Sequence, residues 1–192
     1  MGNPYLCEAF PVASPMSVQH GFYLNLLREN LDLYIPGSTL SCICEFGGGY
    51  GNFCRLAYTM GYEGDYCITD LPVMRAMQKQ YLQHTIPADT LSQSVTFSDE
   101  ICGPGSTTTE ETLFMATFSL SETSMEVREK VEEQLIHYQY LFFAYNQSFG
   151  GIDNEEYFRE LVSRHSERFE FKTKEDPHRR AWFLFGKRKT VA

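Results

Sequence analysis

The segment from Glu45 to Phe53 constrains the fold of this chain more than any other. It reads EFGGGYGNF, and its glycines stand between a short apolar run at 40–46 and a helical pattern at 52–60. Glycine adopts left-handed backbone conformations without strain and lets a ligand approach the main chain closely. A glycine-rich turn between a buried strand and a helix is typical of open α/β sheets, which bind ligands beyond the carboxyl ends of their strands.

Hydrophobic periodicity predicts alternating helices and strands along the rest of the chain. Helices are expected at 17–33, 52–60, 72–84, 125–140 and 155–165. Strands are expected at 40–46, 66–69, 94–98, 112–120, 141–146, 169–174 and 181–187. Strands that alternate with helices indicate a parallel sheet with crossover connections, whereas the last two strands have no helix between them and predict an antiparallel pair.

We therefore expect an α/β fold with a Rossmann-like, seven-stranded, mostly parallel sheet, an antiparallel C-terminal strand and helices on both faces. A length of 192 residues suits one domain over 1–192. Within it, residues 1–38 are expected to form an N-terminal arm and helix, and residues 39–192 the sheet core. Polar residues at 99–111 predict a loop.

The charge balance argues against several classes of partner. The 25 acidic and 16 basic side chains give a net charge of −9, which repels the phosphate backbone of nucleic acid. No stretch approaches the ~20 apolar residues that span a bilayer. The N-terminus lacks the pattern of a secretory signal. We expect a cytoplasmic protein that acts on a small molecule, with neither nucleic acid nor membrane as a partner.

Six cysteines stand at positions 7, 42, 44, 54, 67 and 102. None belongs to a CxxC pair, and no histidine follows at zinc-finger spacing. Cys42 and Cys44 alternate within an apolar run, as small core residues of a strand do. The pattern favours buried structural thiols over disulfides, and no metal site is expected.

The glycine segment can be compared with three known nucleotide-binding loops. A P-loop ends in Gly-Lys-Ser/Thr, which is absent. A GxGxxG dinucleotide fingerprint fails because its third glycine position falls on Asn52 or Cys54, according to the starting glycine. The pattern that fits is an acidic residue followed by three alternate glycines: Glu45, Gly47, Gly49 and Gly51.

That pattern resembles the first motif of the class I S-adenosylmethionine-dependent methyltransferases. These enzymes place an acid after their second strand to bind the ribose hydroxyls, and Asp70 stands there in this chain. A carboxylate suits the task because it accepts two hydrogen bonds at once. The resemblance covers roughly residues 39–188 and implies S-adenosyl-L-methionine as the cofactor, with S-adenosyl-L-homocysteine as the product.

Four shorter phrases resemble the sugar O-methyltransferase group within class I. They are EFGGGYG at 45–51, ITDLP at 68–72, SLSE at 119–122 and Gly-Asn-Pro at 2–4. The resemblance implies a carbohydrate acceptor for the methyl group.

The resemblance also implies where the cofactor binds. The glycine backbone would contact its methionine and ribose parts, Glu45 would orient its amino end, and the ends of the second, third and fourth strands would hold ribose and adenine. The implied cofactor-binding residues are Glu45, Phe46, Gly47, Gly48, Gly49, Gly51, Asp70, Leu71, Phe97, Ser98, Asp99, Phe118 and Ser119. If the N-terminal arm folds over the strand ends, Tyr5, Gln19 and Tyr23 are expected to face the cofactor as well.

Each of these assignments has a structural alternative. Asp70 could cap the helix ahead of Pro72, because aspartate is a favourable cap. Phe97 could be a core residue, and Asp99 a loop acid.

Methyl transfer is an in-line displacement, so an enzyme mainly aligns the acceptor oxygen with the methyl carbon. A hydroxyl acceptor also loses a proton, for which a general base helps. The resemblance implies Glu122, just after the fourth strand, as that catalytic base; its alternative is a cap on the helix near Ser124. Tyr145 and Asn146, at the end of the fifth strand, are expected to bind the acceptor.

The expected function is methylation of a hydroxyl on a sugar or a related small polar metabolite. The motifs of adenine-amino, cytosine-C5 and metal-dependent catechol methyltransferases are missing, which leaves an oxygen acceptor by elimination. An alternative keeps the fold without catalysis, as a cofactor-binding or regulatory module. A nicotinamide oxidoreductase is disfavoured by the broken fingerprint.

Overall fold

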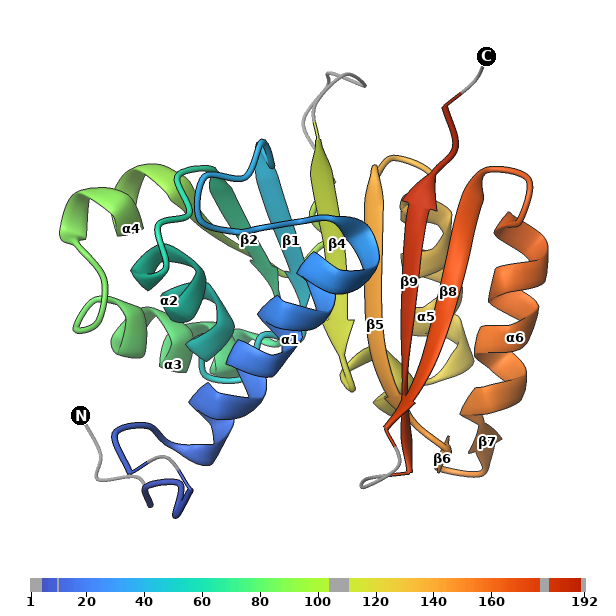
Figure 1. Cartoon of the computed structure of the whole chain (residues 1–192), viewed down its shortest axis with the longest axis horizontal. Coiled ribbons are helices and arrows are strands. Elements are labelled where there is room, and N and C mark those ends of the chain that lie inside the picture. The colour runs from blue at the N-terminus through green and yellow to red at the C-terminus, as the bar shows by residue number, and fades with distance from the viewer. Residues whose placement is uncertain (1–4, 10, 104–110, 177–179, 191–192) are drawn as a thin grey trace.

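The computed structural model describes residues 5–9, 11–103, 111–176 and 180–190 (Figure 1). The helices are α1 (Pro15–Leu31), α2 (Asn52–Thr59), α3 (Pro72–Leu82), α4 (Ala88–Ser94), α5 (Met125–Leu135) and α6 (Asn154–His165), with a 3-10 turn η1 (Leu120–Glu122). The strands are β1 (Cys42–Phe46), β2 (Asp65–Thr69), β3 (Val95–Ser98), β4 (Thr112–Thr117), β5 (Tyr140–Asn146), β6 (Ser148–Phe149), β7 (Ile152–Asp153), β8 (Phe169–Asp176) and β9 (Ala181–Arg188). The phrase at 2–4 and residues 104–110 of the expected loop lie outside the described ranges.

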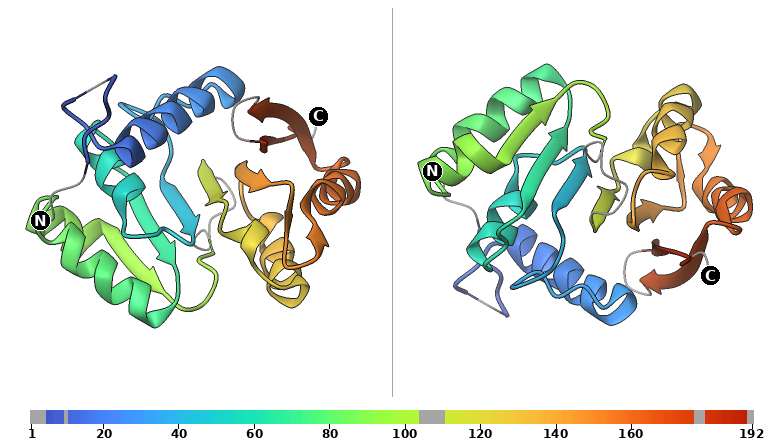
Figure 2. Two further views of the ribbon diagram at one scale, coloured as in Figure 1. Left: turned by 90° about the horizontal axis from the view of Figure 1, so that it is seen from below. Right: turned by 90° about the horizontal axis from the view of Figure 1, so that it is seen from above.

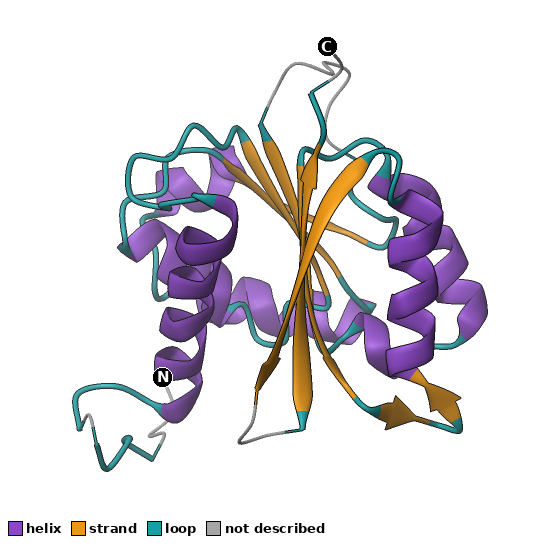
Figure 3. Cartoon of the chain, turned by 45° about the vertical axis from the view of Figure 1, so that its right-hand side comes forward, coloured by secondary structure: helices purple, strands orange, loops and turns teal. Residues whose placement is uncertain are grey.

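Seven strands form one twisted sheet in the order β3-β2-β1-β4-β5-β9-β8 (Figure 3). The first five are parallel, and β9 runs antiparallel to both β5 and β8. In the register, Glu45 of β1 stands opposite Ile68 of β2 and Met115 of β4. The carboxyl ends of these central strands therefore meet at one edge of the sheet. The expected fold class is confirmed.

Helices cover both faces of the sheet (Figure 2). On one face, the buried side chains of α1 and α2 join those of the strands, including Leu26, Leu27, Phe53, Ile43 and Ile68. On the other face, α5 and α6 pack against the same strands through side chains that include Val131, Leu135, Phe158, Phe114 and Leu141. Alternate strand residues face opposite sides, so β1 contributes Ile43 to one core and Cys44 to the other.

Several expected boundaries and elements are wrong. The fourth strand stops at Thr117 because Phe118 has a φ of 68°, which ends extended pairing. The helix expected to reach 140 ends at Leu135, and Tyr138 turns its ring into the core against Phe114. Helix α4 was not predicted, because its segment ADTLSQS lacks an apolar period, and neither was the short hairpin formed by β6 and β7.

A disulfide joins Cys67 of β2 to Cys102, which contradicts the expectation of structural thiols at these two positions. The segment after β3 lies alongside β2, where the Thr69 hydroxyl accepts a hydrogen bond from the Cys102 amide at 3.0 Å and donates to the Glu100 carbonyl at 3.1 Å. The two cysteines are 35 residues apart, so their proximity follows from strand pairing. The other four cysteines form no disulfide; they are Cys7, Cys42, Cys44 and Cys54.

No helix in the described ranges combines the length and apolar character needed to cross a membrane.

Candidate functional site

The glycine loop links β1 to α2 at the carboxyl edge of the sheet. Gly47, Gly49 and Gly51 have φ values of +72°, +55° and +91°, a region that side chains other than glycine rarely adopt. A Cβ atom on Gly47 would lie 2.2 Å from the Ser119 Cβ, so this close approach requires glycine. The Ser119 hydroxyl donates to the Phe46 carbonyl and ties the end of β4 to the loop. The structure thus brings together four of the predicted cofactor residues: Phe46, Gly47, Gly49 and Ser119.

The Glu45 carboxyl group lies directly beneath this loop. It is buried, and the Tyr66 hydroxyl donates a hydrogen bond to its Oε2 atom at 2.7 Å. A Cβ on Gly48 would lie 3.0 Å from the same oxygen. Burial raises the pKa of Glu45 to about 7, with a smaller contribution from the charge of Asp70. Near neutral pH, Glu45 therefore exchanges between its protonated and ionised forms.

Asp70 follows β2 and is held by two donors. Its Oδ1 accepts from the Leu71 amide at 2.8 Å, and its Oδ2 accepts from the Gln78 Nε2 atom at 2.7 Å. Gln78 is fully buried and also donates to the Gly49 carbonyl at 2.9 Å. The N-cap of α3 is Leu71, which makes no side-chain capping bond, so the helix-cap alternative for Asp70 is wrong.

Gln78 is a site residue that sequence reasoning missed. It ties the candidate ribose acid to the glycine loop, and its Oε1 atom is buried without a hydrogen-bond partner among the described residues. The Asp70 carboxylate held in this way offers acceptor oxygens at the carboxyl edge, which fits a ligand with neighbouring hydroxyl groups. The signal in the sequence that could have identified Gln78 was a polar residue at a buried position of the helix predicted at 72–84.

A cavity of about 170 Å³ lies between α1 and the glycine loop. The loop, the end of β4 and α1 line it, and its residues are Met16, Gln19, His20, Tyr23, Glu45, Gly47, Gly48, Gly49, Tyr50, Asn52, Thr117 and Phe118. Gln19 and Tyr23 thus face the loop, whereas Tyr5 is exposed and does not line this cavity. Sequence reasoning missed Met16, His20 and Asn52, whose place follows from the docking of α1 on the sheet.

His20 is a neutral hydrogen-bond donor at the wall of this cavity. Burial and the nearby charge of Arg55 lower the pKa of His20 to about 4. Asn52 accepts from the Arg55 guanidinium through Oδ1, so its Nδ2 amide faces the His20 Nδ1 atom at 3.0 Å. The Nδ1 atom therefore accepts, and the proton of the neutral ring resides on Nε2.

The expected adenine-binding residues gather at the ends of β2 and β3, outside this cavity. Phe97 is half-buried against the core, with the Lys79 ammonium 5.3 Å from its ring centre. Leu71 is 67% exposed at the start of α3. Core contacts thus account for part of the Phe97 ring, while Leu71 remains open to a ligand.

Ser98 and Asp99 make local contacts at the same edge. The Ser98 carbonyl accepts from the Asp70 amide at 3.1 Å, and its hydroxyl accepts from the Glu100 amide at 3.0 Å. Asp99 is exposed and forms an ion pair with Arg75 of α3 at 3.5 Å. The ends of β2 and β3 are thus joined beside Asp70, where the sequence predicted an adenine site.

Among the comparisons with known proteins, the one with solved structures shows the fold. No family model matches the chain. No curated protein matches it. Among solved structures, the methyltransferase domain of bacterial CtHen1-C matches with a TM-score of 0.67 and 10% identity, over 91% of this chain and 99% of that chain. Magnesium protoporphyrin IX methyltransferase from Synechocystis PCC 6803, solved with S-adenosylhomocysteine, matches with a TM-score of 0.62 and 14% identity, over 91% and 83%. The fold is that of the class I methyltransferases.

A third solved structure with a similar fold is that of an O-methyltransferase family protein from Burkholderia thailandensis. It matches with a TM-score of 0.60 and 12% identity, over 92% of this chain and 58% of that chain. At these identities the likeness concerns the fold.

In this methyltransferase fold, Glu122 lies in η1, just beyond β4. Its side chain is exposed, and its Oε1 atom accepts from the Asn146 amide at 3.4 Å. Asn154 donates to the Asn146 oxygen at 2.6 Å and orients that amide. Ser124, the N-cap of α5, makes no side-chain capping bond. The structure thus brings the predicted base and one predicted acceptor residue together.

Tyr145 lies elsewhere. Successive strand residues point to opposite faces, so the ring next to Asn146 turns into the core. It stacks on Phe158 at 4.0 Å and on Trp182 at 6.1 Å between ring centres. Burial raises the pKa of Tyr145 to about 12. Its packing therefore gives it a structural role beside α6.

Arg128 of α5 holds the turn that carries Glu122. Its guanidinium is fully buried and donates to the Ser121 carbonyl at 2.7 Å and to the Thr123 carbonyl at 3.2 Å. The same group lies 4.7 Å from the centre of the Tyr157 ring. Sequence reasoning missed this residue, since an arginine in a charged helical pattern is ordinarily exposed.

Proposed function

We propose that this chain is an S-adenosylmethionine-dependent methyltransferase. The observation that carries the proposal is the link from Asp70 through Gln78 to the glycine loop, which places acceptors for a ribose beside a backbone open to close approach. When bound, the cofactor supplies an electrophilic methyl group. The folds of the solved neighbours, which include methyltransferases, support this reading.

The chain's own residues divide the work of holding that cofactor. Asp70 accepts hydrogen bonds from the ribose hydroxyls, and Glu45 orients the amino end from beneath the loop. His20 donates from Nε2 to the carboxylate end. Burial keeps its ring neutral, so the donor persists across physiological pH. The site residues at β3 and at the end of β4 complete the adenosine contacts.

The acceptor in this proposal is a hydroxyl of a sugar or a related small polar metabolite in the cytoplasm. Glu122 takes the hydroxyl proton, and Asn146, 3.4 Å from it, holds a neighbouring oxygen of the acceptor. The exposed position of Glu122 supports this assignment because a base must reach the acceptor directly. The phrases EFGGGYG, ITDLP and SLSE support the sugar class.

A non-catalytic cofactor-binding or regulatory module is the second candidate. The cavity beside the glycine loop measures about 170 Å³, whereas small-molecule sites usually span roughly 300–1,000 Å³. The small volume of the cavity favours a protein whose cofactor site opens only when a partner or a ligand binds.

Thermal unfolding with and without S-adenosylhomocysteine tests the cofactor assignment. A ligand at 100 times its Kd adds about 2.7 kcal/mol to the native state, which corresponds to a rise of roughly 5–10 °C for a chain of this size. We expect that rise with S-adenosylhomocysteine and none with NADH. No shift at millimolar S-adenosylhomocysteine would contradict the proposal.

Transfer of labelled methyl groups to a panel of sugars and sugar nucleotides then separates the two candidates. We expect a labelled sugar with the native protein and at least a tenfold slower reaction with Glu122→Gln, in keeping with general-base catalysis. Cofactor binding without transfer to any acceptor would favour the non-catalytic module.

A further inference from the structure

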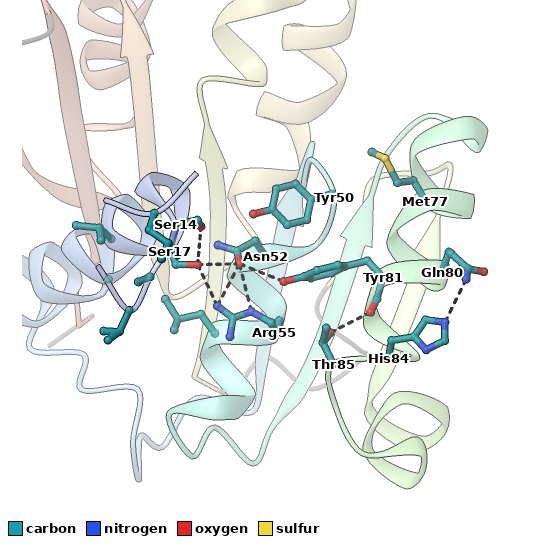
Figure 4. A pocket seen from close by; sticks show the side chains of 16 residues that line it. Ser14, Ser17, Tyr50, Asn52, Arg55, Met77, Gln80, Tyr81, His84 and Thr85 are labelled. Atoms are coloured by element: carbon teal, nitrogen blue, oxygen red, sulfur yellow. Dashed lines mark hydrogen bonds between the residues drawn. The ribbon is translucent and has the colours of Figure 1, made fainter. Parts of the chain in front are cut away.

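A second and larger cavity lies on the outer side of the glycine loop, between the N-terminal arm and helices α1, α2 and α3 (Figure 4). Its volume is about 1140 Å³, which is ample for a metabolite. Tyr50 and Asn52 line both this cavity and the smaller one beside Glu45. The larger cavity is therefore separated from the candidate cofactor site by a single layer of side chains.

Four donors converge on one oxygen at the wall of this cavity. The Asn52 Oδ1 atom accepts from Arg55 Nε at 3.2 Å and Nη2 at 3.1 Å, and from the hydroxyls of Ser17 and Tyr81 at 3.4 Å each (Figure 4). An amide oxygen has two lone pairs, so four donors exceed its capacity. Around the Asn52 Oδ1 atom the donors thus outnumber the lone pairs that can accept them, which favours a ligand that brings acceptors of its own.

Arg55 makes the wall positive. It carries the one permanent charge among the described residues that line the cavity. No carboxylate of the described part of the chain lies within ion-pair distance of its guanidinium, and its partners Asn52 and Ser17 are neutral. A guanidinium binds a carboxylate or phosphate more strongly than it binds an amide oxygen. In a chain of net charge −9, this unpaired cation favours an anion.

The remaining wall is apolar and aromatic. Leu6 and Val12 of the arm line the cavity and are 56% and 78% exposed, and Met77 of α3, which also lines it, is exposed as well. The rings of Tyr50 and Tyr81 meet edge to face, with 4.9 Å between their centres. Exposed apolar side chains around a concave site are typical of ligand-binding surfaces. This wall favours a ligand whose body is apolar or aromatic.

We propose that this cavity binds a small anionic metabolite with an apolar or aromatic body. Its carboxylate or phosphate group pairs with Arg55 and receives the hydroxyl donors of Ser17 and Tyr81, and its body contacts the two tyrosine rings. The site requires neither the cofactor nor methyl transfer, so it goes beyond the proposed function. Because Asn52 also contacts His20, the bound anion adjoins the wall of the candidate cofactor cavity.

Titration of ¹⁵N-labelled protein followed by NMR tests the site, with phenyl phosphate, benzoate and neutral benzyl alcohol as probes. We expect both anions to shift the Arg55 Nε–H and Asn52 side-chain amide signals and to bind at least tenfold more tightly than benzyl alcohol. Arg55→Met is expected to weaken anion binding at least tenfold. The matched control Lys130→Met removes an exposed positive charge of α5 and leaves binding unchanged. The tighter of the two anions identifies phosphate or carboxylate as the natural group.

Any one of three results would overturn the proposal. They are equal binding of the three probes, anion binding that survives Arg55→Met, and unshifted NMR signals of the Arg55 Nε–H and the Asn52 side-chain amide. Because Arg55→Met could disturb folding through Asn52, Tyr81→Phe serves as a second variant. It keeps the ring and removes one hydroxyl donor, and we expect a two- to tenfold weaker affinity for the anions with an unchanged affinity for benzyl alcohol.

Discussion

Glu45 has the most unusual environment of the residues at the carboxyl edge. Its carboxyl group is buried beneath backbone, with the Tyr66 hydroxyl as its donor and Asp70 as a nearby like charge. A buried carboxyl favours its neutral form, because ionisation in a weakly polar interior is expensive. Burial has the opposite effect on the pKa of His20, which it lowers to about 4, because it favours the neutral imidazole over the charged imidazolium. The walls of the small cavity thus hold two groups whose pKa shifts both favour the uncharged form.

Glu45→Gln is expected to change how stability depends on pH. Because the pKa of Glu45 rises from 4.5 to about 7 on folding, the folded state retains a proton that the unfolded state loses. The free energy of unfolding therefore falls by about 3 kcal/mol from Glu45 alone as the pH rises from 4.5 to 7. Urea denaturation across this range measures the difference between native and variant protein.

His20 acts in the opposite direction, because its contribution is lost as the pH falls from 6.5 toward 4. The prediction therefore concerns the difference between the two proteins, in which the His20 contribution cancels. Relative to the native protein, the variant gains stability as the pH rises. Parallel pH profiles for the two proteins would be incompatible with a raised pKa at Glu45.

Asp70→Ala is expected to weaken S-adenosylhomocysteine binding by about 1–3 kcal/mol, as for the loss of charged hydrogen bonds. Calorimetric titration measures the affinity, and urea denaturation measures the accompanying loss of the bond to Gln78. Gln78→Met, which keeps the size of the buried side chain, serves as a comparison for the loop contact alone. An unchanged affinity in Asp70→Ala would remove the ribose assignment.

At the scale of elements, the glycine loop and the end of β4 form one unit. Gly47 fits against Ser119, and the hydroxyl of Ser119 reaches back to the Phe46 carbonyl. Phe118, with a φ of 68°, turns the chain between the end of β4 and Ser119. Parallel pairing of β1 with β4 brings these two turns to the same edge. The site is therefore assembled by two strand ends at once.

Gly47→Ala and Gly49→Ala form a matched pair that tests this unit. Both residues have positive φ values, which cost alanine about 1–2 kcal/mol. A Cβ on Gly49 meets nothing within 4 Å, whereas one on Gly47 collides with Ser119. We expect Gly47→Ala to lower the free energy of unfolding by about 2 kcal/mol more than Gly49→Ala does, in line with overpacking of a tight contact. Urea denaturation checks this, and equal losses would refute the close approach.

At the scale of the whole molecule, one disulfide joins the segment after β3 to strand β2. The Cys67–Cys102 disulfide closes a loop with a sequence separation of 35. Such a link stabilises a chain mainly by restricting its unfolded state. The same segment contacts the core through Tyr138, whose hydroxyl donates to the Cys102 carbonyl.

Cys102→Ser is expected to lower the free energy of unfolding by about 3–4 kcal/mol under oxidising conditions, from the loop-closure relation. Cys54→Ser, which removes a buried free thiol, is the control for losing a cysteine without losing a link. Thiol titration of the unfolded native protein should detect four free thiols. A count of six would mean that the pair is reduced, as cytoplasmic thiols usually are.

Sequence alone determined the α/β class, the glycine turn between β1 and α2, and the acid at the end of β2. These features are local: a run of apolar residues, a cluster of glycines and a polar residue at a strand end are visible within about ten positions. The mostly parallel sheet with an antiparallel C-terminal pair followed because strands that alternate with helices need crossover connections, whereas the last two strands have no helix between them.

Only the tertiary structure decided which distant side chains meet. The docking of α1 placed His20 against Asn52, and the packing of α3 carried Gln78 beneath the loop. The pleat of β5 turned Tyr145 into the core, and the pairing of β2 with β3 brought Cys67 to Cys102. Each of these contacts depends on how whole elements pack, and the periodicity of a single segment carries no information about its partner.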